Sequence, residues 1–268
     1  MTRMPSLFIS HGSPTFAIDP GKAGPLLTQL GRELPRPKAV LVFSPHWTTR
    51  GLRVATTATP ETIHDFGGFP DELYRIQYPA PGAPHVAARA LELLNADGWN
   101  AVADNEWGMD HGAWVPVRHL FPKADVPVFQ VSMPHTLDGE GAVKLGRSLA
   151  PLAEEGVLIV GSGSITHNLR EVVWGAGEEN AGPTYATEFV DWARKAVKAH
   201  DGAALANYAT SAPHARRAHP TPDHYLPLPF AFGAADPDAP VRVIDGGMTF
   251  GVLAMDAYVF GETAKVPA

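Results

Sequence analysis

The chain has 268 residues, of which 45% are hydrophobic, and it carries a net charge of −7. This length and apolar content are typical of one large α/β domain. The sequence has no basic block or stripe, which argues against nucleic-acid binding, and no apolar stretch approaches the roughly 18 residues of a transmembrane helix. The first apolar run is too short for a secretory signal peptide, so we expect a cytoplasmic protein.

The sequence contains no cysteine. This excludes disulfides, thiolate nucleophiles, iron–sulfur clusters and cysteine-ligated zinc, so any transition metal must be held by His, Asp or Glu. Several catalytic motifs are also missing, among them the His-Glu-x-x-His pair of zincins, the Gly-x-Ser-x-Gly elbow, the Walker A loop and the dinucleotide fingerprint. Serine hydrolases, nucleotidases and dehydrogenases are therefore disfavoured.

Short unbroken runs of Val, Ile, Leu and Phe predict strands that are buried on both faces. In chain order, these strands are expected at 6–10, 39–43, 53–57, 101–103, 126–131, 157–160, 241–244 and within 251–260. Helical periodicity predicts helices at 22–33, 84–95, 115–120, 138–152, 185–200, 203–208 and 225–232. The alternation predicts a single α/β domain over 1–268, with a central, mostly parallel sheet flanked by helices.

Three of the predicted strands lead into a histidine. His11 follows the first strand, His46 follows the second, and His167 follows the strand at 157–160. In open α/β sheets, ligands bind outside the carboxyl ends of the strands. Three imidazoles delivered to that edge could bind one metal ion, so the sequence predicts a metal site there.

Further histidines are candidates for the same site. His224 is the best fourth ligand because it lies in a His-rich connector, and His219 stands almost level with it. His111 lies between Trp107 and Trp114 and could donate or accept a proton. The alternative for each of them is an ordinary hydrogen-bonded residue of the core or of a loop.

Residues 58–83 combine glycines with aromatic side chains and predict an irregular loop. One interpretation is a mobile flap whose Phe66 and Phe69 cover a substrate ring, together with Trp114 and with Tyr225 beside His224. The alternative is an ordinary surface loop whose phenylalanines fill a small core of their own.

Taken together, these motifs resemble the class III extradiol ring-opening dioxygenases, specifically the DOPA-dioxygenase branch of the LigB-like superfamily. The motifs span nearly the whole chain and are Ser10-His11-Gly12-Ser13-Pro14, Ser44-Pro45-His46-Trp47, Asp65-Phe66-Gly67-Gly68-Phe69-Pro70, Asp110-His111-Gly112-Ala113-Trp114, Gly161-Ser162-Gly163-Ser164-Ile165-Thr166-His167-Asn168-Leu169 and Asp223-His224-Tyr225.

The resemblance implies a non-haem Fe(II) enzyme that opens a catechol ring with O2, with zinc able to occupy the same position. L-DOPA or a related catechol is the expected substrate and the 4,5 bond the expected cleavage position. His11 and His46 match the first two metal ligands, and His224 matches a further one. His167 matches a histidine at the metal that binds it, acts as acid and base, or does both.

The expected ligand set departs from the 2-His-1-carboxylate pattern of the superfamily. No carboxylate stands out as a third ligand, and Glu106 and Asp223 are the nearest candidates. His167 or His111 would take the phenolic proton and later return it.

Two other readings use the same residues. A zinc-dependent hydrolase or amidohydrolase would activate water with these histidines and would work without oxygen. A non-catalytic binding protein would hold a fully ligated structural metal. The aromatic residues around His111 and from Phe66 to Tyr78 favour a flat ring as ligand. We therefore expect a small catechol and O2 as partners, without nucleic acid or membrane, and the sequence leaves the oligomeric state open.

Overall fold

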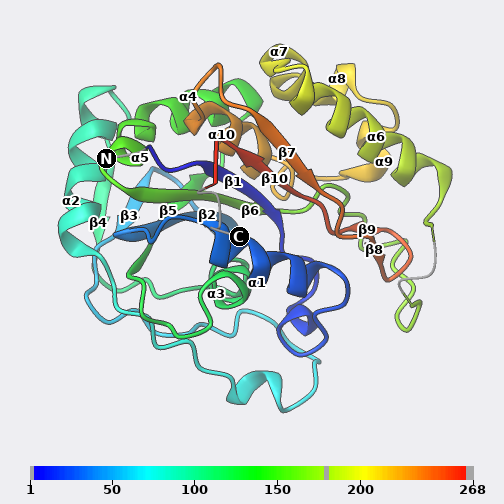
Figure 1. Ribbon diagram of the computed structural model, residues 1–268, viewed down its shortest axis with the longest axis horizontal. Helices are drawn as coiled ribbons and strands as arrows, with labels where there is room; N and C mark the ends of the chain where they lie inside the picture. Colours follow the sequence, from blue (N-terminus) through cyan, green and yellow to red (C-terminus); the bar gives the residue numbers. More distant parts are fainter. Residues whose placement is uncertain (1–2, 178–180, 264–268) are drawn as a thin grey trace.

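Strands and helices alternate along the chain, and the computed structural model assembles the longer strands into one sheet with helices on both faces (Figure 1). The structure describes residues 3–177 and 181–263. The ends of the predicted domain, and residues 178–180 of the Gly-rich segment that follows His167, lie outside the described residues.

Eight strands form the main sheet in the order β4-β3-β5-β2-β6-β1-β10-β7. They are β1 (Ser6–Ser10), β2 (Ala39–Thr49), β3 (Arg53–Ala55), β4 (Val102–Asp104), β5 (Val128–Pro134), β6 (Val157–Gly163), β7 (Val241–Ile244) and β10 (Ala257–Phe260). The central strands β5, β2, β6 and β1 are all parallel, and antiparallel pairs flank them. The predicted mostly parallel sheet in a single α/β domain is confirmed.

Helices cover both faces of this sheet (Figure 1). They are α1 (Ala23–Glu33), α2 (Pro84–Ala96), α3 (His111–Leu120), α4 (Gly139–Leu149), α5 (Pro151–Glu154), α6 (Thr184–Lys198), α7 (Gly202–Ala206), α8 (Tyr208–Ser211), α9 (Ala215–Ala218) and α10 (Pro227–Ala234), with 3-10 turns at Pro14–Ala17 and Leu73–Arg75. A two-stranded hairpin of β8 (Met248–Thr249) and β9 (Leu253–Ala254) lies outside the main sheet.

Strand β6 shows how the two faces are packed. At Gly161, a Cβ atom would lie 2.0 Å from the carbonyl oxygen of Pro227, so only glycine lets α10 approach this closely. The hydroxyl of the next residue, Ser162, donates to the carbonyl oxygen of Gly112 in α3. Since successive strand residues point to opposite faces, α10 and α3 lie on opposite sides of the sheet.

Two element boundaries differ from the sequence prediction, and both concern the site. Strand β2 does not end at Phe43 but continues past His46 to Thr49, with a register shift between Phe43 and Thr48. Pro45, which lacks an amide hydrogen, lies in that irregular stretch, where a proline is tolerated. The prediction of a strand end before His46 is therefore wrong.

Helix α3 begins at His111, four residues earlier than predicted, because the Asp110 carboxylate accepts from the amide of Ala113 and caps the helix. Pro116 therefore lies inside the helix and not in its first turn, contrary to the prediction. Among the described residues, none of the helices combines the length and the apolar character needed to cross a membrane.

Candidate metal centre and active-site cavity

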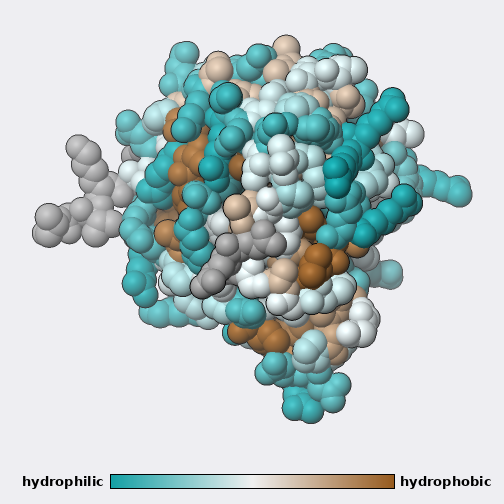
Figure 2. Space-filling view, turned by 90° about the vertical axis from the view of Figure 1, so that its right-hand side faces the viewer, coloured by the Kyte–Doolittle hydropathy of each residue, from teal (hydrophilic) through white to brown (hydrophobic). Residues whose placement is uncertain are grey.

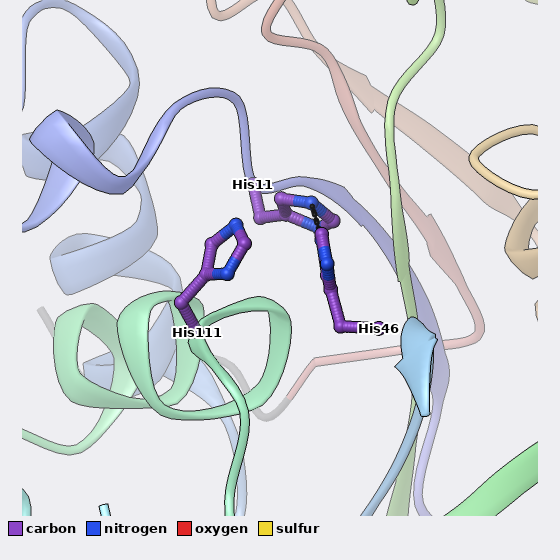
Figure 3. A group of neighbouring side chains, drawn as sticks. All are labelled: His11, His46 and His111. Atoms are coloured by element: carbon purple, nitrogen blue, oxygen red, sulfur yellow. Dashed lines mark hydrogen bonds between the residues drawn. The ribbon is translucent and has the colours of Figure 1, made fainter. Parts of the chain in front are cut away.

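Three neighbouring parallel strands, β2, β6 and β1, deliver their histidines to one edge of the sheet. His11 directly follows β1, His46 lies near the end of β2, and His167 follows β6. The Nε2 atoms of His11 and His46 are 3.1 Å apart (Figure 3). The prediction that these two rings meet is confirmed, although His46 lies within β2 and not after its end.

His111 joins them from the first turn of α3, with its ring directed toward the other two (Figure 3). One nitrogen from each of His11, His46 and His111 lies within 4.8 Å of the others, which is a spacing that a single metal ion can bridge. The ring centroids of His46 and His111 are 3.9 Å apart.

The remaining two predicted histidines lie beside this group. The His224 ring centroid is 5.4 Å from that of His11 and 5.1 Å from that of His46. His167 stacks on His224 with 3.5 Å between centroids and 6° between planes. His219, the alternative to His224, is instead a core residue whose Nε2 is 2.8 Å from the carbonyl oxygen of Ile165.

Each of four rings is held through its Nδ1 atom. His11 Nδ1 lies 2.9 Å from the Ser162 hydroxyl. His111 Nδ1 and His46 Nδ1 lie 2.9 Å and 3.2 Å from the same Asp65 oxygen, and Asp223 holds His224 Nδ1 at 2.6 Å. Partners of this kind fix the tautomer and the orientation of metal-binding histidines.

The tautomer of His11 follows from its hydrogen bonds. The Gly112 carbonyl can only accept, so the Ser162 hydroxyl donates to it and accepts from His11 Nδ1. His46 Nδ1 lies 3.2 Å from an Asp65 oxygen, close enough for an ion pair if the ring is protonated. His11 Nε2 is then an acceptor, and His46 Nε2 lies within hydrogen-bond distance of it at 3.1 Å. The Nε2 lone pair of His11 therefore faces the group of nitrogens whose spacing suits a metal ion.

Burial favours the neutral form of the His11, His46 and His167 rings. The pKa values of His11 and His46 are lowered well below their usual range, first by burial and then by the neighbouring histidines. The pKa of His167 is lowered by burial and by His224 to about 2. Burial alone would raise the pKa of Asp65, but the side-chain hydrogen bond and charge of His111, together with backbone hydrogen bonds, outweigh it and lower the pKa. Neutral imidazoles beside ionised carboxylates are the form that binds a metal.

A buried carboxylate network positions the two elements that carry His46 and His111. Asp110 accepts from the Ser44 hydroxyl at 2.8 Å and from the Gln130 side chain at 2.7 Å. Burial, and then the charge of Asp65, raise the pKa of Asp110 to about 6. At Gly112, a Cβ atom would lie 2.4 Å from the Ser44 hydroxyl oxygen, so this close approach of α3 to β2 needs glycine.

The donor set therefore fits a divalent transition metal bound by imidazole nitrogens. Asp223 and Glu106, the two carboxylates considered as metal ligands, do not belong to the group of His11, His46 and His111. Asp223 binds the far side of the His224 ring, and Glu106 is an exposed residue that belongs to no such group among the described residues.

The histidines open onto a cavity of about 710 Å³. His46, His111, His167 and His224 line it, and so do Phe66 and Phe69 of the 58–83 loop. The positions of these two phenylalanines agree with their predicted place beside a substrate.

Trp114 and Tyr225 do not line this cavity, so the prediction that they contact substrate directly is not retained. Trp114 is fully buried and its Nε1 donates to the carbonyl oxygen of Ile63 at 3.0 Å, which ties the loop to α3. Tyr225 is fully buried, stacks on Tyr208 and donates to the carbonyl oxygen of Leu205 at 2.9 Å. Aromatic character alone did not reveal that their polar atoms are used inside the core.

Sequence reasoning assigned no role to Asp65 or Ser162, although both occur in the motifs that carry the family resemblance. Their function is visible only when the Nδ1 partners of the histidines are known. A carboxylate or hydroxyl in a motif that also supplies a histidine is the signal that could have indicated them.

Residues 5–261 match the protein family described as the catalytic LigB subunit of aromatic ring-opening dioxygenase. The chain is 40% identical to 4,5-DOPA dioxygenase extradiol of Escherichia coli (strain K12), over 95% of this chain and 93% of that protein. It is also 40% identical to the protein of the same name from Beta vulgaris, over 96% of this chain and 97% of the relative.

The fold is similar to the crystal structure of an uncharacterized protein from Escherichia coli K12, with a TM-score of 0.80 and 33% identity over 97% of this chain and 100% of that chain. These similarities extend over almost the whole chain, and the family match at residues 5–261 spans the positions of all five histidines. The chain therefore belongs to the LigB family and is an aromatic ring-opening dioxygenase.

Proposed function

We propose that this protein is a single-domain 4,5-extradiol dioxygenase that opens the ring of a substituted catechol with O2 at a non-haem Fe(II) ion. The main support is the gathering of five histidines, four of which line a cavity that Phe66 and Phe69 help to enclose. L-DOPA is the reference substrate because the relatives from Escherichia coli and Beta vulgaris are named for it. The cytoplasmic location predicted from the sequence is part of this proposal.

In this proposal, His11 and His46 are metal ligands, because both the spacing of the nitrogen atoms and the family resemblance point to them. His111 completes the group of three by nitrogen spacing, whereas the family resemblance points to His224. Either ring can supply the third nitrogen, since both have their Nδ1 atom held by a carboxylate. When bound, Fe(II) would orient catechol and O2 and pass electron density between them.

The protein's own groups would handle the proton and the solvent. His167 lines the cavity, so its ring is placed to accept a proton from a catechol hydroxyl. Whichever of His111 and His224 does not bind the metal is a second candidate for proton transfer. Phe66 and Phe69 would cover the ring and keep water away from it.

The test is oxygen uptake by metal-free protein that has been reloaded anaerobically with Fe(II) and given L-DOPA and simpler catechols. We expect one O2 per catechol and the yellow colour of a ring-opened semialdehyde, with no uptake when zinc is loaded instead. A zinc-dependent hydrolase would turn over its substrate without O2. Intact metal binding without uptake across the catechols would overturn the proposal.

A further inference from the structure

The cavity has two chemically different parts. Its inner end is formed by buried histidines, with His111 only 5% and His224 only 7% exposed. Its outer wall is apolar and partly open to solvent, and consists of Phe66, Phe69, Leu169, Trp174 and Leu253. A volume of about 710 Å³ is within the range of pockets that hold drug-sized ligands, about 300–1,000 Å³, so there is room beyond one catechol ring.

Two side chains of the outer wall are unusually exposed for their size. Leu169 is 60% and Trp174 is 62% exposed. Trp174 lies between Phe69 and Phe250, with ring centroids 6.2 Å and 5.0 Å away. The surface that carries their segment, viewed in Figure 2, is otherwise largely hydrophilic with small separate hydrophobic patches. An apolar group of a bound ligand would cover these side chains and gain the free energy of removing them from water.

The same wall is unsuited to a charged group. Among the described residues that line the cavity, there is no Lys, Arg, Asp or Glu. The ammonium and carboxylate groups of an amino-acid side chain would find no partner of opposite charge among these lining residues, whereas an apolar group would cover exposed apolar surface.

We propose that the catechol favoured by this site carries an uncharged, apolar alkyl or aryl substituent, which lies against Phe69, Leu169 and Trp174. This inference rests on the proposed ring-opening function and refines its substrate class. It makes Leu169 and Trp174 specificity-determining residues, and it ranks L-DOPA below neutral catechols of similar size.

The test compares two substrates that differ mainly in charge, 4-propylcatechol and 3-(3,4-dihydroxyphenyl)propionate, with L-DOPA as a third. Fe(II)-loaded protein is assayed by oxygen uptake, and kcat/KM is measured for each. We expect kcat/KM to be about tenfold or more higher for 4-propylcatechol than for either charged substrate, because apolar pockets discriminate by such factors.

Two variants test whether the outer wall causes this preference. Trp174→Ala should lower the ratio of kcat/KM for 4-propylcatechol to that for unsubstituted catechol, and Leu169→Arg should shift the preference toward the propionate. Val173→Ala is the matched control, since Val173 is 59% exposed in the same segment but does not line the cavity. It should leave both ratios unchanged.

The outcomes separate the two proposals. Oxygen uptake with equal kcat/KM for the matched pair, or with L-DOPA preferred, overturns the inference and leaves the ring-opening function standing. The inference is also overturned if the parent chain prefers 4-propylcatechol but Trp174→Ala and Leu169→Arg show the same preference. The outer wall would then not be the cause of the preference. No uptake with any catechol overturns both proposals.

Discussion

The hydroxyl of Ser162 donates to the carbonyl oxygen of Gly112, across the interface between β6 and α3. In a regular helix, that oxygen would accept from the amide of residue 116, but residue 116 is proline and has no amide hydrogen. The proline therefore leaves a carbonyl for Ser162, and Ser162 in turn accepts from His11 Nδ1. An irregularity in a helix thus fixes the tautomer of a proposed metal ligand on a different element.

Ser162→Ala should weaken metal binding by about 10- to 100-fold, which is typical for the loss of a partner that orients a metal-binding histidine. The His11 ring would lose its only hydrogen-bond partner at Nδ1 among the contacts described here. Metal content after dialysis against a graded series of chelator concentrations measures the effect.

Ser6→Ala is the control for this experiment. Ser6 also lies in a buried strand and donates its hydroxyl to a backbone carbonyl, that of Ala231, at 2.8 Å. It touches no histidine of the site, so its replacement should leave the metal affinity unchanged. Equal metal affinity in both variants would show that Ser162 does not orient His11.

Asp65→Asn should impair both metal binding and turnover, because one Asp65 oxygen holds the Nδ1 atoms of His46 and His111. The amide is similar in size but carries no negative charge and offers one acceptor oxygen in place of two. We expect an affinity loss of about 10- to 100-fold. Asp71→Asn, an exposed carboxylate of the same loop, is the matched control. If Asp65→Asn binds the metal as tightly as the parent chain does, Asp65 does not support the metal ligands.

Replacement of the histidines should identify the ligand set. His46→Ala should abolish metal retention, since His46 belongs to the most closely spaced pair of nitrogens. Of His111→Gln and His224→Gln, we expect one to lose the metal and the other to keep it and turn over slowly. Metal analysis and oxygen uptake on the same samples separate the two roles. Retention of metal and full turnover in both variants would contradict the proposed site.

His167→Gln should retain the metal and lose turnover if this ring transfers the phenolic proton. The effect on the rate is expected to be about 10²- to 10⁴-fold, the usual contribution of a positioned acid or base. Loss of the metal from this variant would instead make His167 a ligand.

The stability of the metal-free protein should fall as the pH decreases from 6.5 to 4, partly because of His219. Burial lowers the pKa of His219 in the folded state to about 4, below the usual value of about 6.5 for a free histidine. Between these two pH values, the unfolded chain binds a proton that the folded chain does not. The contribution of His219 to the free energy of unfolding is therefore complete above pH 6.5 and is lost as the pH falls toward 4. Between pH 7 and 5, this residue should contribute a loss of about 2 kcal/mol.

His219→Gln tests this assignment, because Gln can still donate to the carbonyl oxygen of Ile165 but does not titrate. The free energy of unfolding in urea is measured at pH 7 and pH 5 for both proteins. The variant should show a smaller decrease on acidification than the parent chain, and an equal decrease would refute the role of His219.

The sequence alone predicted the central strands and the edge at which their histidines meet. Unbroken apolar runs leave few alternatives to buried parallel strands, and parallel strands necessarily place their carboxyl ends on one side. His11, His46 and His167 were therefore predicted from local pattern and topology. The choice of His224 over His219 was left open by the sequence, because both lie in the same polar connector.

Only the tertiary structure decided how the rings are held. The hydrogen bonds of Ser162 and Asp65, and the burial of Trp114 and Tyr225 within the core, depend on which side chains meet across elements. Local sequence sets strand and helix periodicity, because these depend on backbone geometry and burial of one face. Contacts between residues more than 40 positions apart depend on how the helices dock on the sheet, and no local pattern encodes that.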